Sequence, residues 1–120
     1  MTSYHVHFSA RDGIPDDALL SQVHAFMATQ IRDNHALSYR VLRLTNKASF
    51  PDLPDFQLIV DYASEDDLQA AFRHMKALYR EEPHAPLMRM VSTFRVSFSR
   101  DEQPPDPEDE GQIAFGNGME

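Results

Sequence analysis

The stretch from residue 3 to residue 10 alternates between apolar and polar side chains. Tyr4, Val6 and Phe8 are the apolar members, and His5 and His7 lie between them. A period of two predicts a β-strand with an apolar face against a core and a second face that carries two imidazoles. The two rings would lie about 6–7 Å apart along the strand. What covers this second face therefore bears directly on function.

Two longer stretches repeat apolar side chains every three or four residues, which predicts amphipathic helices. The expected elements are strands at 3–10, 37–45, 56–62 and 92–99, helices at 16–34 and 64–80, and a short helical turn at 86–90. Ser64 is the expected N-cap of the second helix. Pro51 and Pro54 exclude regular strand pairing in the long connection at 46–55.

The order of these elements is βαββαβ. Both crossover helices can then cover one face of a four-stranded antiparallel sheet with strand order 4-1-3-2, which is the ferredoxin-like α+β fold. The opposite face, which carries His5 and His7, would have no helix over it. Because that face mixes apolar and polar groups, we expect two copies to pair sheet to sheet as a homodimer and to enclose a barrel.

The chain has 120 residues, which suits one folded domain. It contains no cysteine, so disulfides, thiolate metal sites and cysteine nucleophiles are excluded. No apolar stretch approaches the length of a membrane span, and no leader pattern is present at the start. We therefore expect a cytoplasmic protein. No basic stripe with interleaved aromatic residues is present, which argues against nucleic-acid binding.

Acidic residues are concentrated at the C-terminal end. The formal net charge is −8, and residues 101–120 contain acidic residues but no lysine or arginine. We therefore expect a folded domain over residues 1–100 and an acidic, disordered tail over 101–120. The short apolar stretch at 113–115 could dock on the domain or on a second subunit, or it could simply fray with the tail.

Aligning the apolar faces of the first and third strands predicts which polar side chains meet. Placing Tyr4 beside Tyr62 puts His5 across from Asp61. On the other side of the first strand, His7 would lie near Arg95 of the last strand. The candidate catalytic residues are His5, His7 and Asp61.

Three interpretations of this cluster are open. Asp61 could hydrogen-bond His5, raise its pKa and make it a general acid or base. His5 and His7 could instead bind a metal ion with Asp61. The interpretation that we favour is that all three are polar barrel or interface residues, with neither a metal nor a cofactor.

Further candidates for ligand binding lie on the same face or at its edge. The pattern of the second strand favours Leu42 and Leu44 toward the helices, which leaves Tyr39 and Arg43 on the histidine-bearing face. Arg43 or Arg95 could hold an anionic ligand there. His84 follows Pro83 in a segment that could close one mouth of the cavity.

Three stretches resemble the dimeric α/β-barrel superfamily. They are Tyr4-His5-Val6-His7-Phe8, Ala63-Ser64-Glu65-Asp66-Asp67-Leu68 and Pro83-His84-Ala85-Pro86. The last is similar to a His-containing segment of stress-responsive A/B-barrel proteins, and residues 1–100 as a whole resemble a group of small uncharacterised bacterial proteins. The resemblance implies a sheet-to-sheet dimer, and it spans cofactor-free monooxygenases, isomerases, haem-dependent enzymes and proteins of unknown function.

Fold alone does not determine activity in such a superfamily. Our leading hypothesis is a protein that binds a small molecule in a cavity at the sheet face, or one associated with stress without catalysis. The first alternative is a cofactor-free monooxygenase or isomerase that acts on a small aromatic or polyketide-like compound, with His5 or His7 as its base. The second alternative is a purely structural dimer with a filled barrel.

Overall fold

The computed structural model describes residues 1–33, 35–77 and 84–102. Its elements are β1 (Thr2–Ala10), α1 (Asp16–Arg32), β2 (Ser38–Arg43), β3 (Phe56–Tyr62), α2 (Glu65–Ala77), α3 (His84–Met90) and β4 (Val91–Arg100). These agree with the elements expected from the sequence, except that the short turn at 86–90 is a helix of two turns. The predicted end of the second helix and the acidic tail from residue 103 onward lie outside the described residues.

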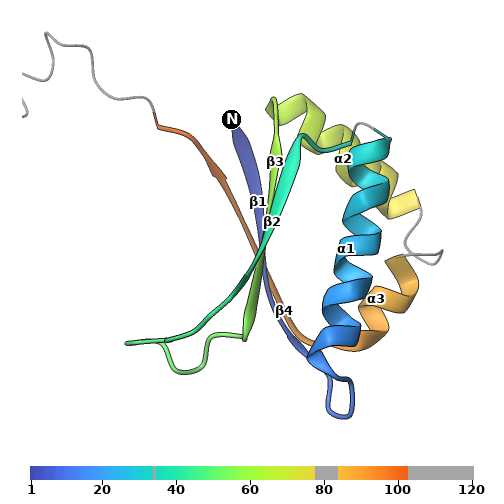
Figure 1. The fold of residues 1–120 in the computed structure, drawn as a ribbon. Coiled ribbons are helices and arrows are strands. Elements are labelled where there is room, and N and C mark those ends of the chain that lie inside the picture. Colours follow the sequence, from blue (N-terminus) through green and yellow to red (C-terminus); the bar gives the residue numbers. More distant parts are fainter. Residues whose placement is uncertain (34, 78–83, 103–120) are drawn as a thin grey trace, which may run out of the picture.

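The four strands form one antiparallel sheet in the order β2-β3-β1-β4. This is the predicted order 4-1-3-2 in reverse, and it confirms the ferredoxin-like arrangement. All three helices lie on one face of the sheet (Figure 1). The opposite face, defined here as the histidine face because it carries His5 and His7, has no described element over it. No helix of the described chain is long and apolar enough to cross a membrane.

The core lies between the sheet and the helices. Alternate residues of β3 are buried along its whole length, and Phe56 and Phe8 stack with ring centroids 5.5 Å apart. Leu19 and Met27 of α1 are also fully buried against this layer. At the start of α2, the Ser64 hydroxyl accepts a hydrogen bond of 3.1 Å from the backbone N–H of Asp67, which confirms the predicted N-cap.

The predicted register between β1 and β3 is wrong by two residues. Tyr4 pairs with Val60 instead of Tyr62, His5 pairs with Ile59, and Asp61 is opposite Ser3. A shift of two residues preserves the alternation of faces, so the apolar pattern alone could not exclude it. The consequence is that Asp61 lies opposite Ser3, two residues along β1 from its expected partner His5.

The predicted orientation of β2 is also wrong. Tyr39 and Arg43 pair with Val60 and Phe56, whose side chains face the helices, so both residues lie on the helix-covered face. The Tyr39 hydroxyl and His24 Nδ1 of α1 are 2.6 Å apart. An edge strand can place a charged side chain on this face because the group still reaches water.

Arg43 is such a charged side chain on the helix-covered face of β2. Its guanidinium lies 4.7 Å from the centre of the Phe56 ring and forms an ion pair of 3.2 Å with Asp16 at the start of α1. The stem of the side chain thus covers apolar surface while the charged head stays half-exposed. Arg43 is therefore held by the helix layer and is not available to a ligand on the histidine face.

The last strand carries apolar side chains that no helix fully covers. Phe94, Val96 and Phe98 pair with core residues of β1, so they face the helix side as predicted. They are nevertheless 46%, 45% and 53% exposed. The reason is that β4 is an edge strand and curves away from the helices along its length (Figure 1).

Candidate functional site

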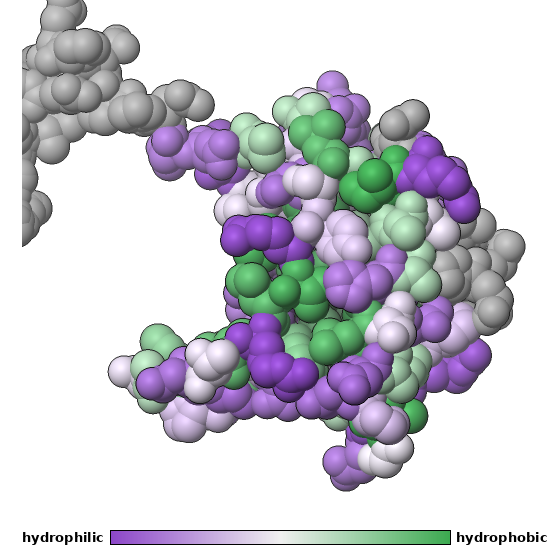
Figure 2. Space-filling view, in the orientation of Figure 1, coloured by the Kyte–Doolittle hydropathy of each residue, from purple (hydrophilic) through white to green (hydrophobic). Residues whose placement is uncertain are grey.

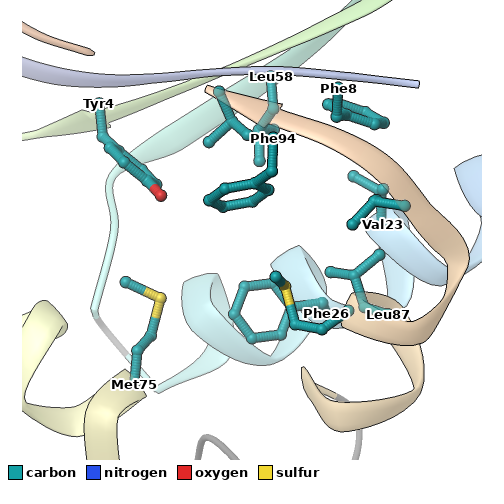
Figure 3. A pocket seen from close by; sticks show the side chains of 11 residues that line it. Tyr4, Phe8, Val23, Phe26, Leu58, Met75, Leu87 and Phe94 are labelled. Carbon is teal, nitrogen blue, oxygen red and sulfur yellow. The ribbon is translucent and has the colours of Figure 1, made fainter. Parts of the chain in front are cut away.

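A pocket of about 60 Å³ lies between the sheet and the helices (Figure 3). Strands β1, β3 and β4 form one wall, and all three helices contribute to the other. Its lining residues are Tyr4, Val6, Phe8, Val23, Phe26, Leu58, Met75, Leu87, Met88, Val91 and Phe94. The Tyr4 hydroxyl is the only hydroxyl among these side chains, and none of them is a histidine or an acid.

Tyr4 is held in place by aromatic contacts. Its ring makes an edge-to-face contact with Phe72 of α2 at 4.9 Å and stacks on Phe98 of β4 at 5.4 Å. The hydroxyl points into the pocket (Figure 3). Burial raises the pKa of Tyr4 to about 12, because the phenolate would lose its hydration. At neutral pH the pocket therefore presents one fixed hydrogen-bond donor in apolar surroundings.

The size of the pocket depends on flexible side chains. As it stands it is smaller than the cavity of about 150 Å³ that binds benzene in an engineered protein. However, Met75 and Met88 line it from α2 and α3, and unbranched methionines change rotamer at low cost. Phe94 of β4 lines the pocket at the side where it is open to solvent. A planar molecule could enter once these three side chains move.

The histidine face holds a second group of polar side chains. His5 Nε2 lies 2.8 Å from the Ser99 hydroxyl, and the amide of Gln57 lies 3.3 Å from His5 Nδ1. When the Gln57 amide nitrogen donates to Nδ1, the ring proton of His5 is on Nε2 and points to the Ser99 hydroxyl oxygen. The ring of His5 is thus oriented from two sides by neighbouring strands.

The remaining predicted catalytic residues are distributed differently from the expected cluster. His7 lies between Gln57 and Arg95, and its Nδ1 is buried without a hydrogen-bond partner among the described residues. Asp61 accepts hydrogen bonds from the hydroxyls of Ser3, at 2.6 Å, and Ser38, at 3.1 Å. The expected bond between His5 and Asp61 is therefore absent. In its place are the two hydrogen bonds from Ser3 of β1 and Ser38 of β2 to Asp61 of β3, called here the serine clamp.

The other predicted ligand-binding residues are scattered. Arg95 is exposed on the histidine face opposite His7, as expected from the sequence. Tyr39 and Arg43 belong to the opposite face. His84 begins α3, but its side chain lies outside what the structure describes. The catalytic and ligand-binding roles assigned to these residues from sequence stay predictions.

The apolar pocket was missed because its residues look like ordinary core positions in the sequence. Tyr4, Val23 and Phe26 follow the periodicity of buried side chains, and periodicity does not reveal where packing is incomplete. The one available signal was the Met-rich segment at 86–90, which places adaptable side chains beside the sheet.

The family model of a family of unknown function, DUF6614, matches residues 1–115. No curated protein matches the chain. The match extends beyond residue 100, where the resemblance seen in the sequence ended.

Solved structures show the same fold at low sequence identity. The At3g17210 protein of Arabidopsis thaliana has a TM-score of 0.68 and 6% identity, over 88% of this chain and 99% of that one. SnoaB, a cofactor-independent oxygenase from Streptomyces nogalater, has a TM-score of 0.62 and 18% identity, over 88% and 96%. A dimeric ferredoxin-like protein from an uncultured marine organism has a TM-score of 0.55 and 15% identity, over 82% and 91%. These likenesses confirm the ferredoxin-like fold.

Proposed function

We propose that this chain, which belongs to the DUF6614 family of unknown function, is a homodimer that binds a small apolar molecule in each subunit. The binding site is the pocket between the sheet and the helices. The observation that carries the proposal is the Tyr4 hydroxyl, a protonated donor aimed into an otherwise apolar cavity.

The chemistry of the pocket defines the class of ligand. Apolar and aromatic walls with a single polar group are typical of small-molecule sites, in which the polar group sets the orientation. Phe94 and Phe26 offer ring faces for stacking. The ligand is therefore a planar, mainly apolar compound with one hydrogen-bond acceptor, such as an aromatic ketone.

The test compares two tyrosines whose rings pack in the core. In Tyr4→Phe, 1-naphthaldehyde or acetophenone should bind about fivefold to tenfold more weakly, because one hydrogen bond of about 1 kcal/mol is lost. Naphthalene, which has no acceptor, should bind equally to both forms. Tyr62→Phe is the matched control, since Tyr62 is buried in the same core but does not line the pocket.

A second pair of variants tests the wall of the pocket. Phe94 and Val96 lie on the same face of β4 and are equally exposed, but only Phe94 lines the pocket. We expect Phe94→Ala to weaken binding of naphthalene severalfold, measured by ligand-detected NMR, and Val96→Ala to leave it unchanged. If no aromatic probe binds, or if both substitutions act alike, the pocket is not the site.

The homodimer is proposed on the histidine face. In the described chain nothing covers this face, and the connection at 44–55 extends from the sheet to that same side (Figure 1). Figure 2 shows the molecule hollowed there, with hydrophobic residues in the floor of the hollow. A similar fold is dimeric in the protein from the uncultured marine organism, which supports the same assembly here.

Charge substitutions can test this assembly. Ser97 is exposed on β4 opposite His5, so Ser97→Arg would bury a charged group at a sheet-to-sheet interface and should shift the protein to monomer in native mass spectrometry. Ala28→Arg places the same group on the exposed surface of α1 and should leave the dimer intact. A wild-type monomer at micromolar concentration would refute the dimer.

A cofactor-free monooxygenase or isomerase is the second candidate, and the fixed orientation of His5 favours it. The Ser99 and Gln57 contacts hold the ring in one pose. A substrate that takes the place of the Gln57 amide would meet the Nδ1 lone pair that a general base needs. In that case His5→Ala should abolish turnover of the substrate and leave the dimer intact, whereas Ser9→Ala, on the same face of β1, should not affect turnover. If the protein is a dimer but neither binds a ligand nor turns over a substrate, the result would favour the remaining alternative, a purely structural dimer.

A further inference from the structure

Two histidines and one aspartate come together where the end of α1 meets α2. Asp33 caps α1, His35 follows it, and His74 lies on α2. The rings of His35 and His74 stack with centroids 4.0 Å apart and planes inclined by 26°. One potential ligand atom from each of the three residues lies within 4.8 Å of the other two.

We propose that Asp33, His35 and His74 form a binding site for a divalent transition metal ion such as Zn²⁺. Imidazole nitrogen and carboxylate oxygen are the ligands that Zn²⁺ takes in proteins besides thiolate, and three protein ligands with water in the fourth position make a common open site. The backbone supports the arrangement, because the N–H of His35 donates to the carbonyl of Gln30 at 2.8 Å. The position of His35 is therefore set by the end of the helix.

Binding requires a small rearrangement. Tetrahedral Zn²⁺ with bonds of about 2.0–2.1 Å places its ligand atoms about 3.4 Å apart. The present separations of up to 4.8 Å must therefore shrink by about 1.4 Å at most. Stacked rings do not direct both nitrogens to one point, so the two imidazoles must rotate out of the stack. The χ2 angle of histidine has a broad minimum, which keeps this rotation inexpensive.

Arg32 opposes cation binding in a way that can be measured. Its Nε forms an exposed ion pair of 3.2 Å with Asp33, and such pairs contribute little to stability. The guanidinium contacts only Oδ1 of Asp33, so a metal ion on this carboxylate would have to tolerate a neighbouring positive charge. We therefore expect Arg32→Gln to increase metal affinity severalfold, which a purely structural role for the cluster would not produce.

The test uses full-length untagged protein and Zn²⁺, Co²⁺ or Ni²⁺ alone. Calorimetry should detect one Zn²⁺ per chain, with affinity reduced at least about tenfold in His74→Ala and in Asp33→Asn, since one ligand of three is removed. His24→Gln is the control, because His24 is an exposed histidine outside the cluster. Circular dichroism without metal verifies that each variant is folded.

A spectroscopic measurement does not depend on any variant. Paramagnetic Ni²⁺ should broaden the ring signals of His35 and His74 at substoichiometric concentration before those of His5 or His24. Broadening that begins at His5, or Zn²⁺ affinity that survives His74→Ala in a folded protein, would overturn the proposal. These results are independent of ligand binding in the apolar pocket, to which Asp33, His35 and His74 do not contribute.

Discussion

The substitution Tyr62→Phe should make the protein more resistant to alkaline unfolding. Tyr62 ends β3 and only 3% of its surface is exposed. Burial, followed by the neighbouring Tyr4, raises the pKa of Tyr62 to about 12. An unfolded tyrosine titrates near 10. Between these values the unfolded chain has released its phenolic proton while the folded protein retains it, so rising pH favours unfolding.

The size of the effect follows from the two pKa values. The contribution of Tyr62 is fully present below pH 10 and is lost as the pH rises through 12. At pH 11 the linkage relation gives a loss of about 1.4 kcal/mol for a group with pKa values of 10 and 12. Phenylalanine has no such proton, so wild type should lose about this amount relative to the variant between pH 8 and pH 11.

Urea unfolding at fixed protein concentration measures the effect. The free energy of unfolding is determined for both proteins at pH 8 and at pH 11, and the difference between them is compared. The measurement at pH 8 corrects for any change in packing caused by the substitution itself. Because Tyr4 contributes to the shift, the effect should be smaller in a Tyr4→Phe background. A difference that is the same at both pH values would refute this account of the buried tyrosines.

Four further outcomes are expected. Phe56→Ala, which empties a fully buried position, should cost about 3–5 kcal/mol in urea unfolding. Asp61→Ala should cost about 1–3 kcal/mol, because the buried Ser3 hydroxyl loses its acceptor; equal stability would contradict the serine clamp. Ser64→Ala should cost about 1 kcal/mol through loss of the α2 cap. Truncation after Glu102 should leave the melting temperature unchanged, as expected if the domain ends near residue 100.

Local patterns in the sequence were sufficient for much of the fold. Apolar residues at every second position identified the strands, and apolar residues at every third or fourth position identified both long helices. These spacings are informative because each backbone conformation returns a side chain to the same face at a fixed interval. The cap at Ser64 was predicted from chemistry that acts within one turn. The order βαββαβ with right-handed crossovers then allowed few topologies, and the observed strand order is the expected one.

Only the tertiary structure decided which residues meet across those elements. Alternation is unchanged when a strand slides by two residues, so the pairing of Asp61 with Ser3 instead of His5 was invisible in the sequence. In β2 the adjacent apolar residues Val41 and Leu42 fit either face, and the pairing of Val41 with the buried Leu58 places Val41, not Leu42, toward the helices. The pocket beside Tyr4 depends on how closely the helices pack on the sheet, and the approach of His35 to His74 depends on how the end of α1 meets α2. Such packing arises from contacts between segments distant along the chain, which no local pattern specifies.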